Sequence, residues 1–216
     1  MKRLIFFAVY LSLVFVTNAQ DWRSFKFETG DLLFQDLDCG DLCDAIESVT
    51  PAVNNHHLSH VGLAYVTGEI VWVIEAMGED VHLTTIKSFM ERQTDALGQP
   101  KVIVGRVSDE YSNLAGRAVG FALEQKGKPY DDEFIYDNGK YYCSELIYDA
   151  FKAAHNNKPI FEMMPMTFKD PKTNKTLPVW EEYFKNLGRK IPEEKKGISP
   201  GLLANDDNVE IVKYFY

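Results

Sequence analysis

The sequence predicts an α+β domain in which helices pack against a mostly antiparallel sheet. Two β-rich runs, residues 60–66 and 69–76, flank a short turn in the pattern of a β-hairpin. Two other stretches, 111–125 and 143–154, carry apolar residues at helical spacing, and residues 209–215 alternate as a closing strand would. Hairpin-linked strands beside separate helices are typical of the α+β class.

The remaining elements follow in chain order. Short strands are expected at residues 31–35 and 101–107, and a helix at 42–49 that ends before Pro51. Residues 161–187 are less periodic and richer in proline, lysine and aromatic residues. This segment either covers a cleft or packs on the surface, and we favour packing.

The amino terminus has the three regions of a secretory signal peptide. A basic pair precedes an apolar run at residues 4–16, and small residues follow that end in Ala19. The run is short for a bilayer span of ~20 residues, which disfavours a membrane anchor. No cysteine follows Ala19 directly, so a bacterial lipid anchor is not expected. We expect a cleaved signal peptide over 1–19 and a soluble, periplasmic or extracellular single domain over 20–216.

The charge of the chain limits its partners. A net charge of −9 argues against nucleic acid, which requires a basic surface, and does not favour an anionic membrane. No glycine-rich phosphate loop, repeat or later membrane-spanning run is present in the sequence, and we expect no cofactor. A zinc hydrolase built on His56, His57 and His60 would need further ligands at metal spacing, so we expect no metal either.

Three residues form a candidate catalytic set. Cys143 begins a predicted helix, where unpaired N–H groups and the helix dipole lower the pKa of a thiol. If Val66 pairs with Glu69 across the hairpin turn, His60 stands opposite Glu75, with Cβ atoms about 5 Å apart on one face. The carboxylate could then hold one imidazole nitrogen and leave the other facing the thiol.

Each of these residues also has a purely structural explanation. A lone cysteine in an apolar helix is usually a small buried hydrophobe, and His60 could be satisfied by backbone groups. Glu75 is harder to explain this way, because a carboxylate within Val-Trp-Val-Ile-Glu-Ala is costly to bury without a partner. His56 and His57 are alternative bases, but only His60 leads directly into a strand. The coincidence of all three residues favours a site.

The other two cysteines leave an alternative open. Cys39 and Cys43 are close enough to form a disulfide if they lie in a loop, but not if both are helical. A disulfide and two free thiols are equally compatible with the sequence. With or without a Cys39–Cys43 disulfide, Cys143 stays free, as a catalytic thiol must be. A disulfide between Cys143 and either of the other cysteines would contradict a catalytic role for Cys143.

Six short blocks resemble, in order, the circularly permuted papain-like cysteine hydrolases of the NlpC type, specifically the YiiX/YebB-like branch. They span most of the predicted mature chain and are Thr29–Gln35, Asp44–Ile46, Ser59–Leu63, Val73–Ala76, Gly127–Asp131 and Tyr142–Leu146. The resemblance implies a permuted papain-like fold in which the histidine precedes the nucleophile. It implies Cys143 as nucleophile, His60 as general base and Glu75 as the third member. It also implies that the Cys143 N–H contributes to an oxyanion hole. Cys39 and Cys43 are not features of the family.

The resemblance implies a cysteine peptidase or amidase acting through a thioester on Cys143, and the predicted signal peptide makes it an exported one. We favour an amide of a cell-wall peptide or a related small amide as substrate. Tyr130, Asp131 and Tyr142 are expected to line the substrate cleft, although ordinary packing explains at least one of the tyrosines here, Tyr141 included. The alternatives are an acyltransferase or lipid acyl hydrolase, and a non-catalytic binding protein. The intact Cys, His and Glu set disfavours a binding protein.

Overall fold

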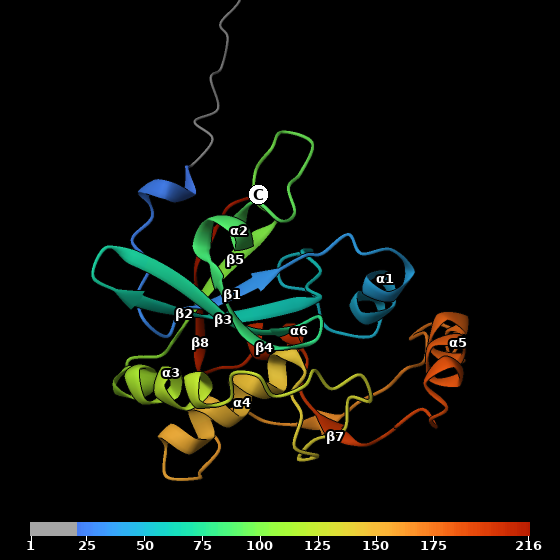
Figure 1. Ribbon diagram of the computed structural model, residues 1–216. Coiled ribbons are helices and arrows are strands. Elements are labelled where there is room, and N and C mark those ends of the chain that lie inside the picture. The colour runs from blue at the N-terminus through green and yellow to red at the C-terminus, as the bar shows by residue number, and fades with distance from the viewer. Residues whose placement is uncertain (1–20) are drawn as a thin grey trace, which may run out of the picture.

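A six-stranded antiparallel sheet lies at the centre of the computed structural model, which describes residues 21–216 (Figure 1). The predicted signal peptide lies outside the described residues. The strand order is β4-β3-β2-β1-β5-β8. The strands are β1 (Leu32–Gln35), β2 (His60–Thr67), β3 (Ile70–Met77), β4 (Asp80–Thr85), β5 (Val102–Val107) and β8 (Val209–Tyr214). Two shorter strands, β6 (Met164–Pro165) and β7 (Lys196–Gly197), pair separately.

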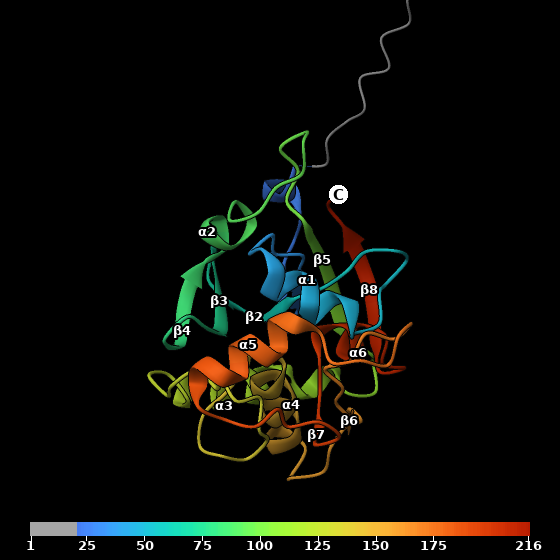
Figure 2. The same ribbon diagram turned by 90° about the vertical axis from the view of Figure 1, so that its right-hand side faces the viewer.

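The helices lie around this sheet in two groups. α3 and α4 pack on each other and against β2 and β3, whereas α1 and α5 pack on each other beside the sheet (Figures 1 and 2). The α-helices are α1 (Asp41–Ser48), α2 (Ile86–Met90), α3 (Ala115–Glu124), α4 (Cys143–Ala154), α5 (Pro178–Leu187) and α6 (Pro200–Ala204). Short 3-10 helices are η1 (Trp22–Ser24) and η2 (Ser112–Leu114). No helix within residues 21–216 has the length and apolarity needed to cross a bilayer.

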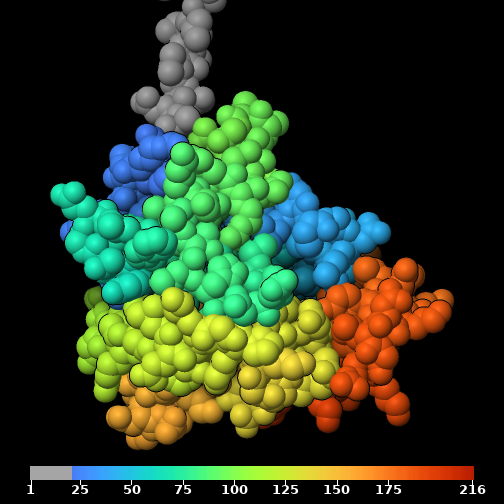
Figure 3. Space-filling view, viewed as in Figure 1, coloured from blue at the N-terminus to red at the C-terminus, as the bar shows by residue number. Residues whose placement is uncertain are grey.

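Both faces of the sheet are buried because the central strands alternate their side chains between two cores. Leu32 and Phe34 of β1 join the core that α3 and α4 complete, while Leu33 joins a second core on the opposite face. A third, smaller cluster contains Trp180 and Phe184 of α5 with apolar residues of α1. Figure 3 shows the α5 segment beside residues near 130, where Phe134 packs edge-on against Trp180.

The predicted hairpin is present, but its register was wrong by two residues. Val66 pairs with Val71 rather than with Glu69, and the turn consists of Gly68 and Glu69. Gly68 has a φ of +61°, which suits a glycine at the first position of a two-residue hairpin turn. A shift of two residues preserves the face of every side chain, so His60 and Glu75 still share one face.

Gly62 of β2 permits close packing between the sheet and α2. A Cβ there would overlap Val73 Cγ1 and lie 3.2 Å from Phe89 Cε2, and both side chains are fully buried. We expect Gly62→Ala to lower the free energy of unfolding by about 1–3 kcal/mol, as overpacking does. Gly120→Ala is the matched control, because a Cβ at this exposed position of α3 meets no atom within 4 Å. Denaturant unfolding should show Gly120→Ala to be more stable than the parent by about 0.5–1 kcal/mol; equal effects would contradict the packing explanation.

Candidate active site

Cys143 is the first residue of α4, as predicted, and its side chain is buried. Two side chains of the first turn fix the start of the helix. Glu145 accepts hydrogen bonds from the backbone N–H groups of Asp137, at 3.0 Å, and Tyr142, at 3.4 Å. Ser144 donates to the carbonyl of Ile198 at 2.7 Å. The thiol is therefore held at a helix amino terminus whose position is fixed from both sides.

His60 and Glu75 meet across β2 and β3 as a buried pair. Nε2 of His60 lies 2.6 Å from Oε2 of Glu75. Because Nε2 is engaged by the carboxylate, Nδ1 is the imidazole nitrogen left to interact with Cys143. The ring of Phe89 lies beside the imidazole, with centroids 6.0 Å apart. The structure thus brings together the three residues predicted as the catalytic set.

Glu75 has further partners that the sequence did not predict. Arg92 donates from Nη1 to Oε2 at 3.0 Å and from Nη2 to Oε1 at 2.5 Å. Thr84 of β4 also donates to Oε1, and Nε2 of His82 lies 3.8 Å from the same oxygen. The cost of burying Glu75 was the only sequence signal that the carboxylate needs such partners. Arg92 could not be identified as one of them, because it follows a strand and a helix that the sequence did not predict.

The three groups favour their charged forms despite burial. Burial raises the pKa of the Cys143 thiol, but interaction with His60 and hydrogen bonds from the Val61 and Ser144 N–H groups together lower it below its ordinary value. Burial lowers the pKa of His60, but Cys143 and Glu75 together raise it to about 9. Burial raises the pKa of Glu75, but His60 and Arg92 hold it well below its ordinary range. The arrangement therefore shifts all three groups toward their charged forms, which are a thiolate, an imidazolium and a carboxylate.

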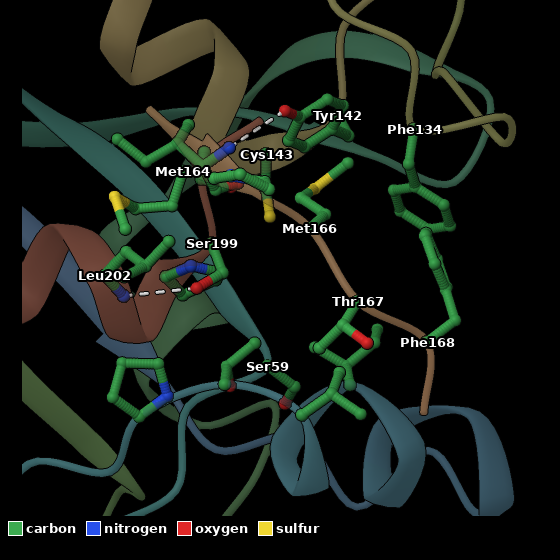
Figure 4. Close-up of a pocket in the computed structure, with 18 of the residues that line it drawn as sticks. Ser59, Phe134, Tyr142, Cys143, Met164, Met166, Thr167, Phe168, Ser199 and Leu202 are labelled. Carbon is green, nitrogen blue, oxygen red and sulfur yellow. Dashed lines mark hydrogen bonds between the residues drawn. The ribbon is translucent and has the colours of Figure 1, made fainter. Parts of the chain in front are cut away.

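A cavity of about 220 Å³ lies beside Cys143, whose sulfur points into it in Figure 4. Its walls come from α1, α4, α5, α6 and the segments around Tyr130 and residues 164–168. Within residues 21–216, the lining includes no Asp, Glu, Lys, Arg or His. The apolar lining residues are Ile46, Val49, Pro51, Phe134, Met164, Pro165, Met166, Phe168, Trp180, Ile198, Pro200 and Leu202.

Two of the three predicted substrate residues line this cavity. Tyr130 and Tyr142 contribute to its wall, and the Tyr142 hydroxyl accepts a hydrogen bond from the Ile198 N–H at 3.3 Å. Asp131 is not among the lining residues. Its carboxylate is fully buried and accepts hydrogen bonds from the Glu133 and Ile135 N–H groups at 3.1 and 2.7 Å. Asp131 therefore fixes the loop that follows Tyr130.

Two expectations about neighbouring segments are also resolved. Residues 161–187 both pack on the surface through α5 and form a cavity wall through residues 164–168, so the predicted preference for packing alone was wrong.

Cys39 and Cys43 form a disulfide, which is possible because Cys39 precedes α1 and only Cys43 lies inside it. Cys143 is free.

His56, one of the alternative bases, packs against tyrosines near the carboxyl terminus. His56 stacks edge-on against Tyr216, with centroids 4.4 Å apart, and lies 5.6 Å from the ring of Tyr214. In the part of the chain that the structure describes, no group of three or more His, Cys, Asp or Glu side chains is placed to hold a metal ion.

Comparison with known proteins shows which family this chain is similar to. The sequence model of a family described as permuted papain-like amidases, YaeF/YiiX, C92 family, matches residues 26–213. The uncharacterised protein YiiX of Escherichia coli K12 is 25% identical over 190 residues, covering 88% of this chain and 86% of that protein. A crystal structure described as metalloprotein yiiX from Escherichia coli O157:H7 superimposes with a TM-score of 0.68 at 24% identity, covering 88% of this chain and 98% of that one. The predicted resemblance and the permuted papain-like fold are confirmed.

Proposed function

Since the chain belongs to the C92 family of permuted papain-like amidases, we propose that it is an exported cysteine amidase that acts through a thioester on Cys143. One observation carries the proposal: a free thiol at a helix start lines a cavity and interacts with His60, which in turn is bound by the buried Glu75. Nε2 of His60 lies 2.6 Å from Oε2 of Glu75. The signal-peptide pattern of residues 1–19 supports export.

In the proposed reaction, the Cys143 thiolate attacks the carbonyl carbon of the amide. The oxygen that becomes negative is stabilised by the Cys143 N–H at the start of α4. The His60 imidazolium gives its proton to the amine nitrogen as the C–N bond breaks, which leaves a thioester. Neutral His60 then takes a proton from water as the water oxygen attacks the thioester carbon. The C–S bond breaks, the acyl group leaves as a carboxylic acid, and the thiolate and the imidazolium are restored. Glu75 orients the imidazole throughout and stays ionised.

Two substrate classes follow from different observations. Export to the cell envelope favours a cell-wall peptide or a related small amide. The cavity favours a lipid-derived acyl group instead, because its lining within residues 21–216 includes no charged side chain that could bind the ionised groups of a wall peptide. Tyr130 and Tyr142 would lie beside the reacting carbonyl in either case, because both line the cavity together with Cys143. An acyl acceptor other than water would make the same site a transferase.

The structural relative is described as a metalloprotein, but the described residues of this chain do not fit a metal site. A metal site needs several His, Cys, Asp or Glu ligands, and residues 21–216 hold no group of three placed for one. No step of the proposed reaction is therefore routed through a metal.

The substrate class can be tested with the mature chain, residues 20–216, beside its Cys143→Ala variant. Each is incubated with purified wall fragments and with N-acyl amino acids of increasing chain length, and products and protein are analysed by mass spectrometry. We expect an amine released only by the parent protein and an acyl mass added to Cys143. Cleavage of wall fragments alone would overturn the acyl-chain substrate. No product and no adduct in either series, with an unreactive thiol, would support a binding protein instead.

A further inference from the structure

We propose that Arg92 is a positioning residue of this catalytic site, which acts through Glu75 to keep Cys143 in its thiolate form. The inference rests on the proposed function, because it concerns the same thiol. Arg92 follows α2 and lies 17 residues beyond Glu75 in the chain. Arg92 is a candidate for neither nucleophile nor base, because Glu75 is the member of the catalytic set to which it is hydrogen-bonded.

The first argument is geometric. Each oxygen of Glu75 receives two hydrogen bonds: Oε2 from His60 and Arg92, and Oε1 from Arg92 and Thr84. A guanidinium that binds both oxygens of a carboxylate fixes its plane as well as its position. Fixing this plane directs Oε2 at Nε2 of His60, and so holds Nδ1 toward Cys143.

The second argument concerns charge. In the reactive state the thiolate and the carboxylate carry one negative charge each and the imidazolium one positive charge, which leaves a net charge of −1 on groups that are at most 6% exposed. An unbalanced buried charge is costly, and the least costly way to remove it is to protonate the thiolate. Arg92 brings the sum to zero. An arginine suits this position because its guanidinium stays protonated at any working pH.

The third argument is that other residues hold Arg92 itself. Its Nη1 also donates to Oε1 of Gln35 at 3.3 Å, and its guanidinium carbon lies 5.1 Å from the centroid of the Phe89 ring. Gln35 is fully buried and is anchored by donating to the Phe89 carbonyl at 2.9 Å. A buried glutamine that does not line the cavity is thus used to orient the arginine.

Other titratable groups also face this network. His82 lies 3.8 Å from Glu75 on the β4 side, and its Nδ1 is 3.2 Å from Oδ1 of Asp80. The thiol faces His60 and lines the cavity with the hydroxyl-bearing Tyr130 and Tyr142. His82 is partly exposed and carries an imidazole close to Glu75, so the pH dependence must be compared between variants that all retain it.

The test measures the rate of Cys143 alkylation by iodoacetamide from acidic to alkaline pH in the parent protein, Arg92→Met and Arg92→Lys. We expect Arg92→Met to shift the midpoint of reactivity upward by about one pH unit, a roughly tenfold loss of rate on the acidic side. The rates should converge at alkaline pH, where the thiol ionises without help. Lysine restores the charge but not the two-oxygen contact, so its midpoint should lie between those of the parent and Arg92→Met.

Arg106→Met is the matched control. Arg106 also binds both oxygens of a fully buried carboxylate, that of Asp31, at 2.7 and 3.0 Å, yet neither residue lines the cavity or contacts Glu75. This substitution should destabilise the fold without moving the midpoint. If Arg92→Met does not fold, as judged by circular dichroism, Arg92→Lys decides alone.

The possible failures are distinguishable. An unchanged midpoint in the Arg92 variants, with a parent thiol that reacts at acidic pH, would overturn the role of Arg92 and leave the proposed function intact. A parent thiol with an ordinary midpoint would overturn both. A shift of equal size in Arg106→Met would show a general effect of lost charge and would overturn the positioning role.

Discussion

Replacing Cys143 with serine is expected to lower turnover at least about 10³-fold while the protein keeps its fold. Serine has nearly the shape of cysteine, so α4 and its contacts through Glu145 and Ser144 should be unaffected. Its hydroxyl ionises far above the pH at which a thiol does, and the His60 imidazolium cannot hold it as an alkoxide. Steady-state kinetics on the substrate found with the parent protein measure this loss, and thermal unfolding checks the fold.

The same variant identifies the reactive thiol. The sequence contains three cysteines, and two of them form the Cys39–Cys43 disulfide. Iodoacetamide should therefore label the parent protein once and Cys143→Ser not at all. Substantial turnover by Cys143→Ser would show that another group performs the chemistry, and labelling of the variant would show that the disulfide is open in solution.

The sequence predicted which three residues meet at the candidate site better than it predicted their surroundings. Cys143, His60 and Glu75 could be found because each residue type was unusual in its segment: a cysteine at a helix start, and a histidine and a glutamate in apolar strands. The predicted hairpin register was wrong by two residues, but His60 and Glu75 still lie on one face of the sheet, because a shift of two residues keeps every side chain on its face.

The partners of these residues could not be predicted because they depend on tertiary contacts. Thr84 and Arg92 lie in or beyond β4 and α2, which are short and have no strong period. Asp131 was predicted to face substrate, yet its side chain bonds to the backbone two and four residues ahead. Short polar residues in loops often bind the local backbone in this way, and nothing in the sequence distinguishes such a role from contact with a ligand.

The apolar cavity was likewise invisible in the sequence. Its walls combine α1, α6 and the segment 164–168, which are far apart in the chain, and residues 161–187 lack the periodicity that would place them. The disulfide lies at the start of one of these walls, because Cys43 belongs to α1, which also provides Ile46 and is followed by the lining residue Val49. Composition shows how many apolar residues exist but not which of them remain beside a thiol after folding.

Replacement of His60 by alanine should lower turnover by about 10²- to 10⁴-fold, the usual contribution of a general acid and base. It should also slow alkylation of Cys143 at neutral pH, because the thiolate loses the imidazolium that stabilises it. His155→Ala is the control, since His155 follows the opposite end of α4, about 18 Å along the helix axis from Cys143. A His60→Ala variant with the kinetics of the parent would exclude His60 as the base.

The pH dependence of the parent protein separates the two roles of His60. Contacts with Cys143 and Glu75 raise its pKa from 6.5 to about 9, so the imidazolium persists as pH rises from 6.5 and is lost only as pH passes about 9. Amide cleavage needs this proton for the leaving amine, so turnover should fall above about pH 9. Alkylation needs only the thiolate and should not fall there. If alkylation fell together with turnover at alkaline pH, loss of the proton for the leaving amine would not explain the fall in turnover. If neither fell, another group would supply the proton.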